Sequence, residues 1–288
     1  MHGAHHTLAT NPLISTEVQR WRRRWPWVLP AGLAAALLAC AITVVPALVA
    51  SRDATGMDDF ASSLLVVGWA GNCAAGVAWF VVLIAIPVLA GTAVSRLHDS
   101  GLADSLRITL LNGHDIADGY LVRALLRHPA WLLAAALLPL GSATGLTTGL
   151  VFPYQSAGTA GPDPVTWIAA VAYPAVHTLQ ALVQLAACVE IGILAGLHTR
   201  SPGNTAAATV GGLFVFELLL PSGCGLCLSF SQIFMLEGMV GEYGPTGSTG
   251  LYTLLLGLAG MGLQLLYQLG LFFAARAFAA RRFDQGEA

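Results

Sequence analysis

Long apolar runs separated by short polar segments dominate this chain, a pattern typical of an all-α protein that crosses a membrane several times. A helix needs roughly 18 or more apolar residues to cross the hydrocarbon core of a bilayer. Runs close to that length recur along the sequence with few charges inside them. We therefore predict a polytopic membrane protein with six transmembrane helices, at about residues 27–50, 60–94, 129–152, 165–197, 205–220 and 249–278.

The composition leads to the same conclusion. Of the 288 residues, 56% are hydrophobic and 10% are charged, and the mean hydropathy is +0.71. A typical soluble domain has about 25% charged residues, and a soluble core cannot absorb this much apolar surface. We divide the chain into an N-terminal tail with an interfacial helix at 1–26 and a transmembrane domain at 27–288.

The basic residues indicate the orientation in the membrane. All 13 are arginine, and if the N-terminus is cytoplasmic, every one except Arg52 falls on the cytoplasmic side. Because cytoplasmic loops carry such an excess of basic residues, we predict a multi-pass protein of the bacterial inner membrane with both termini in the cytoplasm. The absence of lysine excludes a phosphate-binding P-loop in this chain.

The segment before the first predicted span has the pattern of an amphipathic helix at the membrane surface. Asn11 and Pro12 form a helix cap followed by proline at the first helical position. Tryptophans at headgroup depth and arginines toward anionic lipid suit such a helix. The alternative is a charged flank that follows only the positive-inside rule. The residues spaced along the predicted apolar face are Ile14, Val18, Trp21 and Trp25.

The longest charged segment, at 95–128, lies between the second and third predicted spans. Asn112 can cap a helix, and Asp115 three residues later completes a pair typical of a capping box. We predict a short helix at 113–126 outside the bilayer, and this helix needs a protein partner or a lipid surface.

The spacing of glycine, aspartate and threonine residues in this segment resembles that of the loop between the second and third spans of type-2 ABC exporter permeases. In that family the pattern runs roughly Gly-Thr-x-Glu, then Thr-Pro, then Glu-Ile-x-x-Gly-Lys. Here Leu102, Leu110 and Tyr120 replace the threonine, proline and lysine. The ATPase-coupling residues that the resemblance implies are Gly101, Asp104, Thr109, Asn112, Asp115, Ile116 and Gly119.

The resemblance implies an architecture and partners. These permeases have an interfacial elbow helix that often opens with Asn-Pro, and a re-entrant hairpin between the fifth and sixth spans, which corresponds to the outer loop at 221–248. Two permease subunits, identical or different, bind two cytoplasmic nucleotide-binding ATPase chains, which carry the ATP and Mg. The complex exports lipids, glycans, drugs, peptides or ions. The resemblance implies no cofactor in this chain and no nucleic-acid partner.

Two other functions compete with this interpretation. Asp115, Asp118, Gly119 and Arg123 spell D-x-x-D-G-x-x-V-R, which resembles the opening half of the motif of CDP-alcohol phosphotransferases. That chemistry needs further aspartates on the same helical face to hold divalent metal. The next one, Asp163, lies beyond a whole predicted span, so we expect no catalytic or metal site. The second alternative is a membrane assembly protein without transport activity.

Several polar residues fall inside the predicted spans. A charged side chain at the centre of a membrane helix costs about 2.5–3.5 kcal/mol on insertion scales, so such residues tend to face the protein interior. We predict that they lie on a translocation path or at a subunit interface, and the alternative is hydrogen bonding between helices without a substrate. These residues are Glu217, Glu190, His177, Gln180 and Gln184.

Cys224 and Cys227 form a C-x-x-C pattern on the predicted outer face. An oxidising compartment permits a disulfide there. A local disulfide and two free thiols are both compatible with the sequence.

Overall fold

The computed structural model describes residues 11–24, 26–27, 30, 34, 58–100, 111–129, 131–132, 134–135, 164–199, 201–219 and 247–285. Within these ranges every regular element is a helix, which confirms the all-α fold class. Most residues of the predicted spans at 27–50 and 129–152 lie outside the described residues. The same is true of the predicted re-entrant loop at 221–248.

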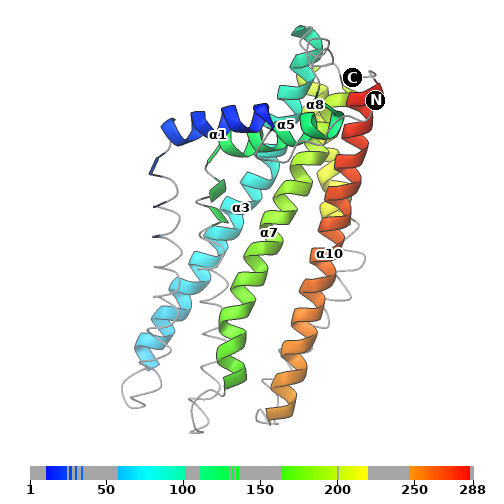
Figure 1. The fold of residues 1–288 in the computed structure, drawn as a ribbon. Coiled ribbons are helices and arrows are strands. Elements are labelled where there is room, and N and C mark those ends of the chain that lie inside the picture. The colour runs from blue at the N-terminus through cyan, green and yellow to red at the C-terminus, as the bar shows by residue number, and fades with distance from the viewer. Residues whose placement is uncertain are drawn as a thin grey trace.

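Three long helices, α3 (Asp58–Ser100), α7 (Pro164–His198) and α10 (Gly247–Gln285), form a bundle (Figure 1). Their bounds lie close to the predicted spans at 60–94, 165–197 and 249–278, although α3 and α10 each extend about two turns beyond the predicted end. Each has a segment long and apolar enough to cross a membrane: Cys73–Arg96, Ala175–His198 and Ala259–Gln285. Within the described residues, three helices could thus cross a membrane, which supports a membrane protein.

Glycines bring α3 and α7 into backbone contact. A Cβ atom at Gly192 would collide with the carbonyl oxygen of Pro87, and one at Gly196 would collide with that of Gly91. Gly192 and Gly196 are four residues apart, the small-xxx-small spacing that permits close packing of membrane helices. Since both contacts advance in the same direction along the two helices, α3 and α7 run parallel.

The chain reverses direction after α7. Ser201 caps α8 (Pro202–Leu213) by accepting a hydrogen bond from the backbone N–H of Asn204 at 3.2 Å, and Pro202 stands at the start of the helix. The helix α8 continues directly into the π-helix η1 (Phe214–Leu219) and packs against α3 and α7. The segment predicted as the fifth span, 205–220, is therefore helical as far as Leu219, where the described residues end, and Glu217 lies in its π-helical part.

Two shorter helices lie across one end of the three long ones (Figure 1). They are α1 (Pro12–Arg24) and α5 (Gly113–Arg127), which pack against each other. We call this pair the transverse layer. The helix predicted at 113–126 is confirmed as α5. Its apolar face, with Ile116, Ala117 and Tyr120, joins the same buried core as Val94 of α3 and Ala279 of α10, so the layer is part of the folded unit.

Replacing Gly192 with alanine should destabilise the protein, because the added methyl group has no room against the backbone of α3. Overpacking of this kind typically costs roughly 1–3 kcal/mol. Gly262 of α10 is the matched control, since a methyl group added there would meet nothing within 4 Å. There, alanine should be neutral or stabilising by up to about 1 kcal/mol, from helix propensity alone. The measurement is thermal unfolding in detergent, and equal melting temperatures for the two variants would contradict the packing.

Candidate functional site

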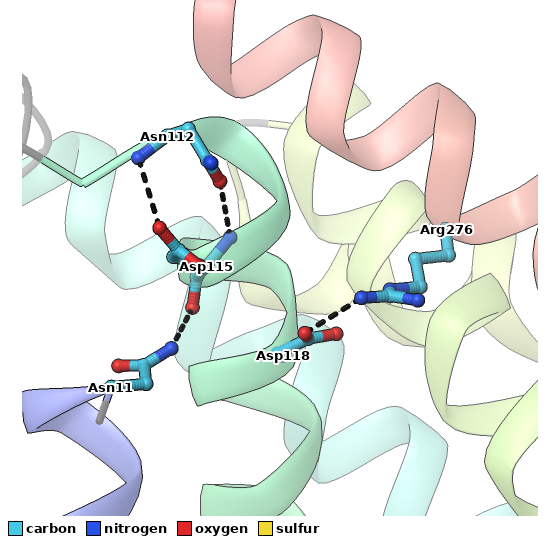
Figure 2. Close-up of polar contacts among 5 residues, drawn as sticks. All are labelled: Asn11, Asn112, Asp115, Asp118 and Arg276. Atoms are coloured by element: carbon cyan, nitrogen blue, oxygen red, sulfur yellow. Dashed lines mark hydrogen bonds and ion pairs between the residues drawn. The ribbon is translucent and has the colours of Figure 1, made fainter. Parts of the chain in front are cut away.

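The N-terminus of α5 is fixed by a complete capping box (Figure 2). The side chain of Asn112 accepts a hydrogen bond from the backbone N–H of Asp115 at 2.8 Å, and Asp115 accepts one from the backbone N–H of Asn112 at 3.4 Å. The pair that the sequence predicts is therefore confirmed. These bonds satisfy donors that the first turn of a helix otherwise leaves free.

The same terminus is attached to the end of α10. The backbone N–H of Gly113 donates to Oδ1 of Asp284 at 2.7 Å. A side chain at Gly113 would collide with the carbonyl oxygen of Ala280, so only glycine permits this approach. Beside it, Tyr120 stacks on Phe283 with ring centroids 6.2 Å apart. Burial raises the pKa of Tyr120 to about 12, although the positive charge of Arg123 acts in the opposite direction. The phenol therefore stays neutral at physiological pH.

The helix α1 is held on α5 by one buried hydrogen bond. Asn11, which is 1% exposed, donates from Nδ2 to the carbonyl oxygen of Asp115 at 2.8 Å (Figure 2). A partly exposed ion pair, Glu17 with Arg123 at 3.7 Å, adds a second contact. Of the predicted apolar face, Ile14 is buried in the protein, Val18 and Trp21 are half-buried, and Trp25 lies outside the described residues. Contact of α1 with lipid stays a prediction.

The packing of α5 changes the interpretation of its predicted coupling residues. The sequence suggested that this helix needs a separate partner, but α1, α3, α7 and α10 of its own chain already contact it. Asp115 and Ile116 are 5% and 4% exposed, and Gly119 is also buried, so these residues position α5 and do not form its outer surface. Gly101, Asp104 and Thr109 lie outside the described residues. The residues exposed on α5 are His114, Arg123 and Arg127.

An ion pair connects the transverse layer to the membrane helices. Arg276 of α10 donates to Oδ2 of Asp118 of α5 at 2.7 Å (Figure 2). Glu190 of α7 is fully buried and interacts electrostatically with both. Neither of its carboxyl oxygens, nor Nε of Arg276, has a hydrogen-bond partner among the described residues. Among the described residues, Arg276 thus pairs with Asp118, and the buried carboxyl group of Glu190 lies near this pair without a hydrogen bond to it.

The sequence did not indicate this arrangement. In the sequence, Arg276 counted only toward the excess of arginine on one side of the membrane, and Asp118 only toward the phosphotransferase-like motif. The two residues lie 158 positions apart, so no local pattern connects them. The one available signal was the presence of an arginine inside the apolar run of the sixth predicted span.

A second polar site lies farther along the bundle. Glu217 of η1 accepts two hydrogen bonds at Oε2, from Gln184 of α7 at 2.7 Å and from Gln268 of α10 at 2.9 Å. We call these three residues the Glu217 cluster. Next to it, the hydroxyl of Tyr267 donates to the carbonyl oxygen of Phe216 at 2.6 Å. The cluster therefore joins three helices through polar groups within the apolar bundle.

The structure separates the residues that were predicted for a translocation path. Glu217 and Gln184 meet in the Glu217 cluster, whereas Glu190 lies with Arg276 closer to the transverse layer. Gln180 is buried and His177 half-buried, both on α7 beyond Gln184. Cys224 and Cys227 lie outside the described residues. Among the residues that are described, no group of three or more His, Cys, Asp or Glu side chains is placed to hold a metal ion.

Comparison with known proteins finds no matching family model, no matching curated protein and no matching solved structure. The functional interpretation therefore depends on the arrangement of the helices, on the two polar sites and on the sequence pattern of the loop that contains α5.

Replacing Asn11 with alanine should loosen α1 from α5, because it removes the buried hydrogen bond that Asn11 donates to the carbonyl oxygen of Asp115. Such a bond contributes about 0.5–1.5 kcal/mol. Hydrogen–deuterium exchange should show faster exchange across α1 in this variant. The control is Gln19→Ala on the exposed side of α1, which should leave the exchange unchanged. Identical exchange in both variants would show that the bond does not hold the layer together.

Arg276→Gln should destabilise the protein more than Asp118→Asn. Loss of the guanidinium leaves the Asp118 carboxylate, which is 14% exposed, without its cation, whereas in Asp118→Asn the amide oxygen can still accept a hydrogen bond from Arg276, which is 27% exposed. Breaking a buried pair costs about 3–5 kcal/mol, and the partial exposure of this one places Arg276→Gln near the lower end. Denaturation of both variants in the same detergent tests the order, and the reverse order would show that the uncompensated Asp118 carboxylate costs less than the loss of its charge.

Proposed function

We propose that this chain is the membrane-spanning permease subunit of a type-2 ABC exporter and that a separate chain hydrolyses ATP. The observation that carries the proposal is α5, a capped helix laid across the ends of three membrane-length helices. It lies in the loop whose spacing resembles the family's coupling segment. Its inner face is packed against its own chain, and its outer face presents basic and polar side chains.

The directions of the described helices support six crossings. The register of Gly192 and Gly196 on α3 makes α7 parallel to α3. Gln184 of α7 lies level with Gln268 of α10, since both donate to Glu217, and farther along Glu190 lies near Arg276, so α10 is parallel to α7. In the proposed topology the chain returns to the other end of the bundle before each of these three helices, because α1 lies at the end where they finish. The segment of α8 and η1 would begin one return, and the predicted spans at 27–50 and 129–152 would supply the other two.

The distribution of charge supports the orientation. The arginines with described side chains lie in α1, in α5 and toward the C-terminal ends of α3 and α10, which is the end of the bundle that the transverse layer covers. By the positive-inside rule this end is cytoplasmic. In the proposed topology, α1 is the elbow helix at the inner membrane surface, α5 is the coupling helix, and both termini are in the cytoplasm.

The contacts of α5 supply a route by which movement at an ATPase reaches the membrane. His114, Arg123 and Arg127 would meet the ATPase because they are exposed. A displacement of α5 would then act on α10 through the Gly113–Asp284 hydrogen bond and the Asp118–Arg276 ion pair. Asp115, Ile116 and Gly119 keep α5 rigid enough to transmit such a displacement.

A second permease subunit, identical or different, would complete the translocation route, and bilayer lipid would cover the remaining apolar surface. Large apolar side chains exposed on the long helices, such as Phe80, Leu266 and Phe273, suit both contacts. The exported substrate belongs to one of the classes lipid, glycan, drug, peptide or ion. The lipid-head-group transferase is disfavoured, since Asp115 is engaged in the helix cap and Asp118 pairs with Arg276.

The test is co-isolation from native membranes, followed by transport in vesicles. The native chain should co-isolate with a nucleotide-binding protein, and Arg127→Glu should reduce ATP-driven transport by about tenfold or more, the factor that corresponds to a loss of about 1.4 kcal/mol in binding. Arg96→Glu on α3 is the control, because it reverses another exposed positive charge outside α5. A chain that never co-isolates with an ATPase, and whose membranes transport nothing in an ATP-dependent manner, would support the assembly protein instead.

A further inference from the structure

The apolar face of α1, which the sequence predicts to meet lipid, is used inside the protein. Ile14 is 8% exposed, and Val18 and Trp21 are half-buried. Asn11 fixes the start of the helix on α5 through its hydrogen bond to the carbonyl oxygen of Asp115. An amphipathic helix binds a bilayer by inserting its apolar face. Among the side chains described on α1, that face is already covered, so any contact with lipid must come from the other side.

The opposite face of α1 is polar and basic. Each exposed side chain described on the helix carries a hydroxyl, an amide or a guanidinium group. These residues are Ser15, Thr16, Gln19, Arg20, Arg22 and Arg23. Over its whole length α1 has four arginines and one glutamate, so its formal net charge is 4 − 1 = +3.

Ion pairs inside the protein use only part of this charge. Glu17 contacts Arg20 at 3.0 Å and Arg123 of α5 at 3.7 Å. In the described part of the chain, the ion pairs include neither Arg22 nor Arg23. These two arginines follow Gln19 by three and four residues, a spacing that places side chains next to one another on a helix. We call Gln19, Arg22 and Arg23 the arginine face.

The position of α1 brings the arginine face to the membrane surface. The helix lies across the end of the three membrane-length helices and finishes at Arg24, just before the first predicted span (Figure 1). Trp27, at the start of that span, is 50% exposed, and tryptophan is enriched at the level of the lipid headgroups. Clusters of four or more basic residues next to a membrane helix are typical of binding to anionic lipid.

We propose that the arginine face binds the phosphate groups of anionic phospholipids and thereby holds the transverse layer at the membrane surface. A guanidinium group can donate two parallel hydrogen bonds to phosphate oxygens. Phosphatidylglycerol has a net negative charge, whereas the choline of phosphatidylcholine offsets its phosphate, so the face should select the former. An acidic protein surface has complementary charge too, but the position beside the bilayer favours lipid. The inference needs a membrane location and not the proposed export function.

Photo-crosslinking from the arginine face tests the proposal. A benzophenone side chain replaces Gln19 in the full-length chain, which is placed without any ATPase in nanodiscs of equal parts phosphatidylglycerol and phosphatidylcholine. Mass spectrometry of the adducts then gives the ratio of the two lipids at this position. Phosphatidylglycerol should predominate. Since each basic residue near an anionic surface contributes about fivefold in affinity, Arg22→Gln with Arg23→Gln should lower the ratio by about 25-fold.

Two further variants separate charge from other effects. Arg22→Lys with Arg23→Lys keeps both positive charges and should keep most of the preference. Arg96→Gln with Arg281→Gln is the matched control, because it removes two exposed charges from the ends of α3 and α10 and should leave the ratio at position 19 unchanged. Raising the ionic strength from about 0.15 M to about 1 M shortens the screening length from about 8 Å to about 3 Å and should weaken the preference.

The proposal makes a distinct contrary outcome possible. An equal ratio of the two lipids in the native chain, unchanged by salt, would show that the arginine face does not select anionic lipid. The absence of any lipid adduct would show that the face does not meet the bilayer, and an adduct with an acidic protein in native membranes would then identify its partner. The salt comparison uses the native arginines, so it decides the matter even if the glutamine variant does not accumulate.

Discussion

The attachment of α5 to the end of α10 is the interaction on which the arrangement of this protein depends. The hydrogen bond from Gly113 to Asp284 and the stacking of Tyr120 on Phe283 hold a helix with a polar outer face across the ends of apolar ones. Without it, the N-terminus of α5 would be held to α10 only through the Asp118–Arg276 ion pair farther along the helix, and α1, which rests on α5, would move with it. The proposed coupling role requires this attachment, because a loosely held helix transmits no displacement to the membrane.

The polar groups inside the bundle are arranged at two levels with different chemistry. Near the transverse layer, Arg276 of α10 pairs with Asp118 of α5 beside the buried Glu190 of α7, so a shift of α5 acts directly on this pair. Farther along, the Glu217 cluster contains amides and a carboxyl group and no cation among the described residues. Since α7 and α10 contribute to both levels, movement of one helix against the other affects both together.

The sequence was most informative where the determining pattern is local. Hydropathy located α3, α7 and α10, and the Asn112–Asp115 pair located the start of α5, because caps and apolar runs are properties of consecutive residues. It also identified Glu217 and Gln184 as polar residues in spans. It gave no indication that Asp115 and Ile116 face inward, or that Arg276 pairs with Asp118. Gln268 stands out in the sequence as a polar residue of the sixth predicted span, but its contact with Glu217 does not. Those facts depend on contacts between segments 51 to 171 residues apart.

Photo-crosslinking from single positions of α5 tests the central claim most directly. A crosslinker placed at Arg127 or His114, both on the exposed face, should capture a nucleotide-binding protein in native membranes, whereas one at Ile116, on the buried face, should capture only its own chain. Capture of an ATPase from the exposed positions alone would establish α5 as the coupling helix. Capture of lipid alone from the exposed positions, with the complex otherwise intact, would contradict the account.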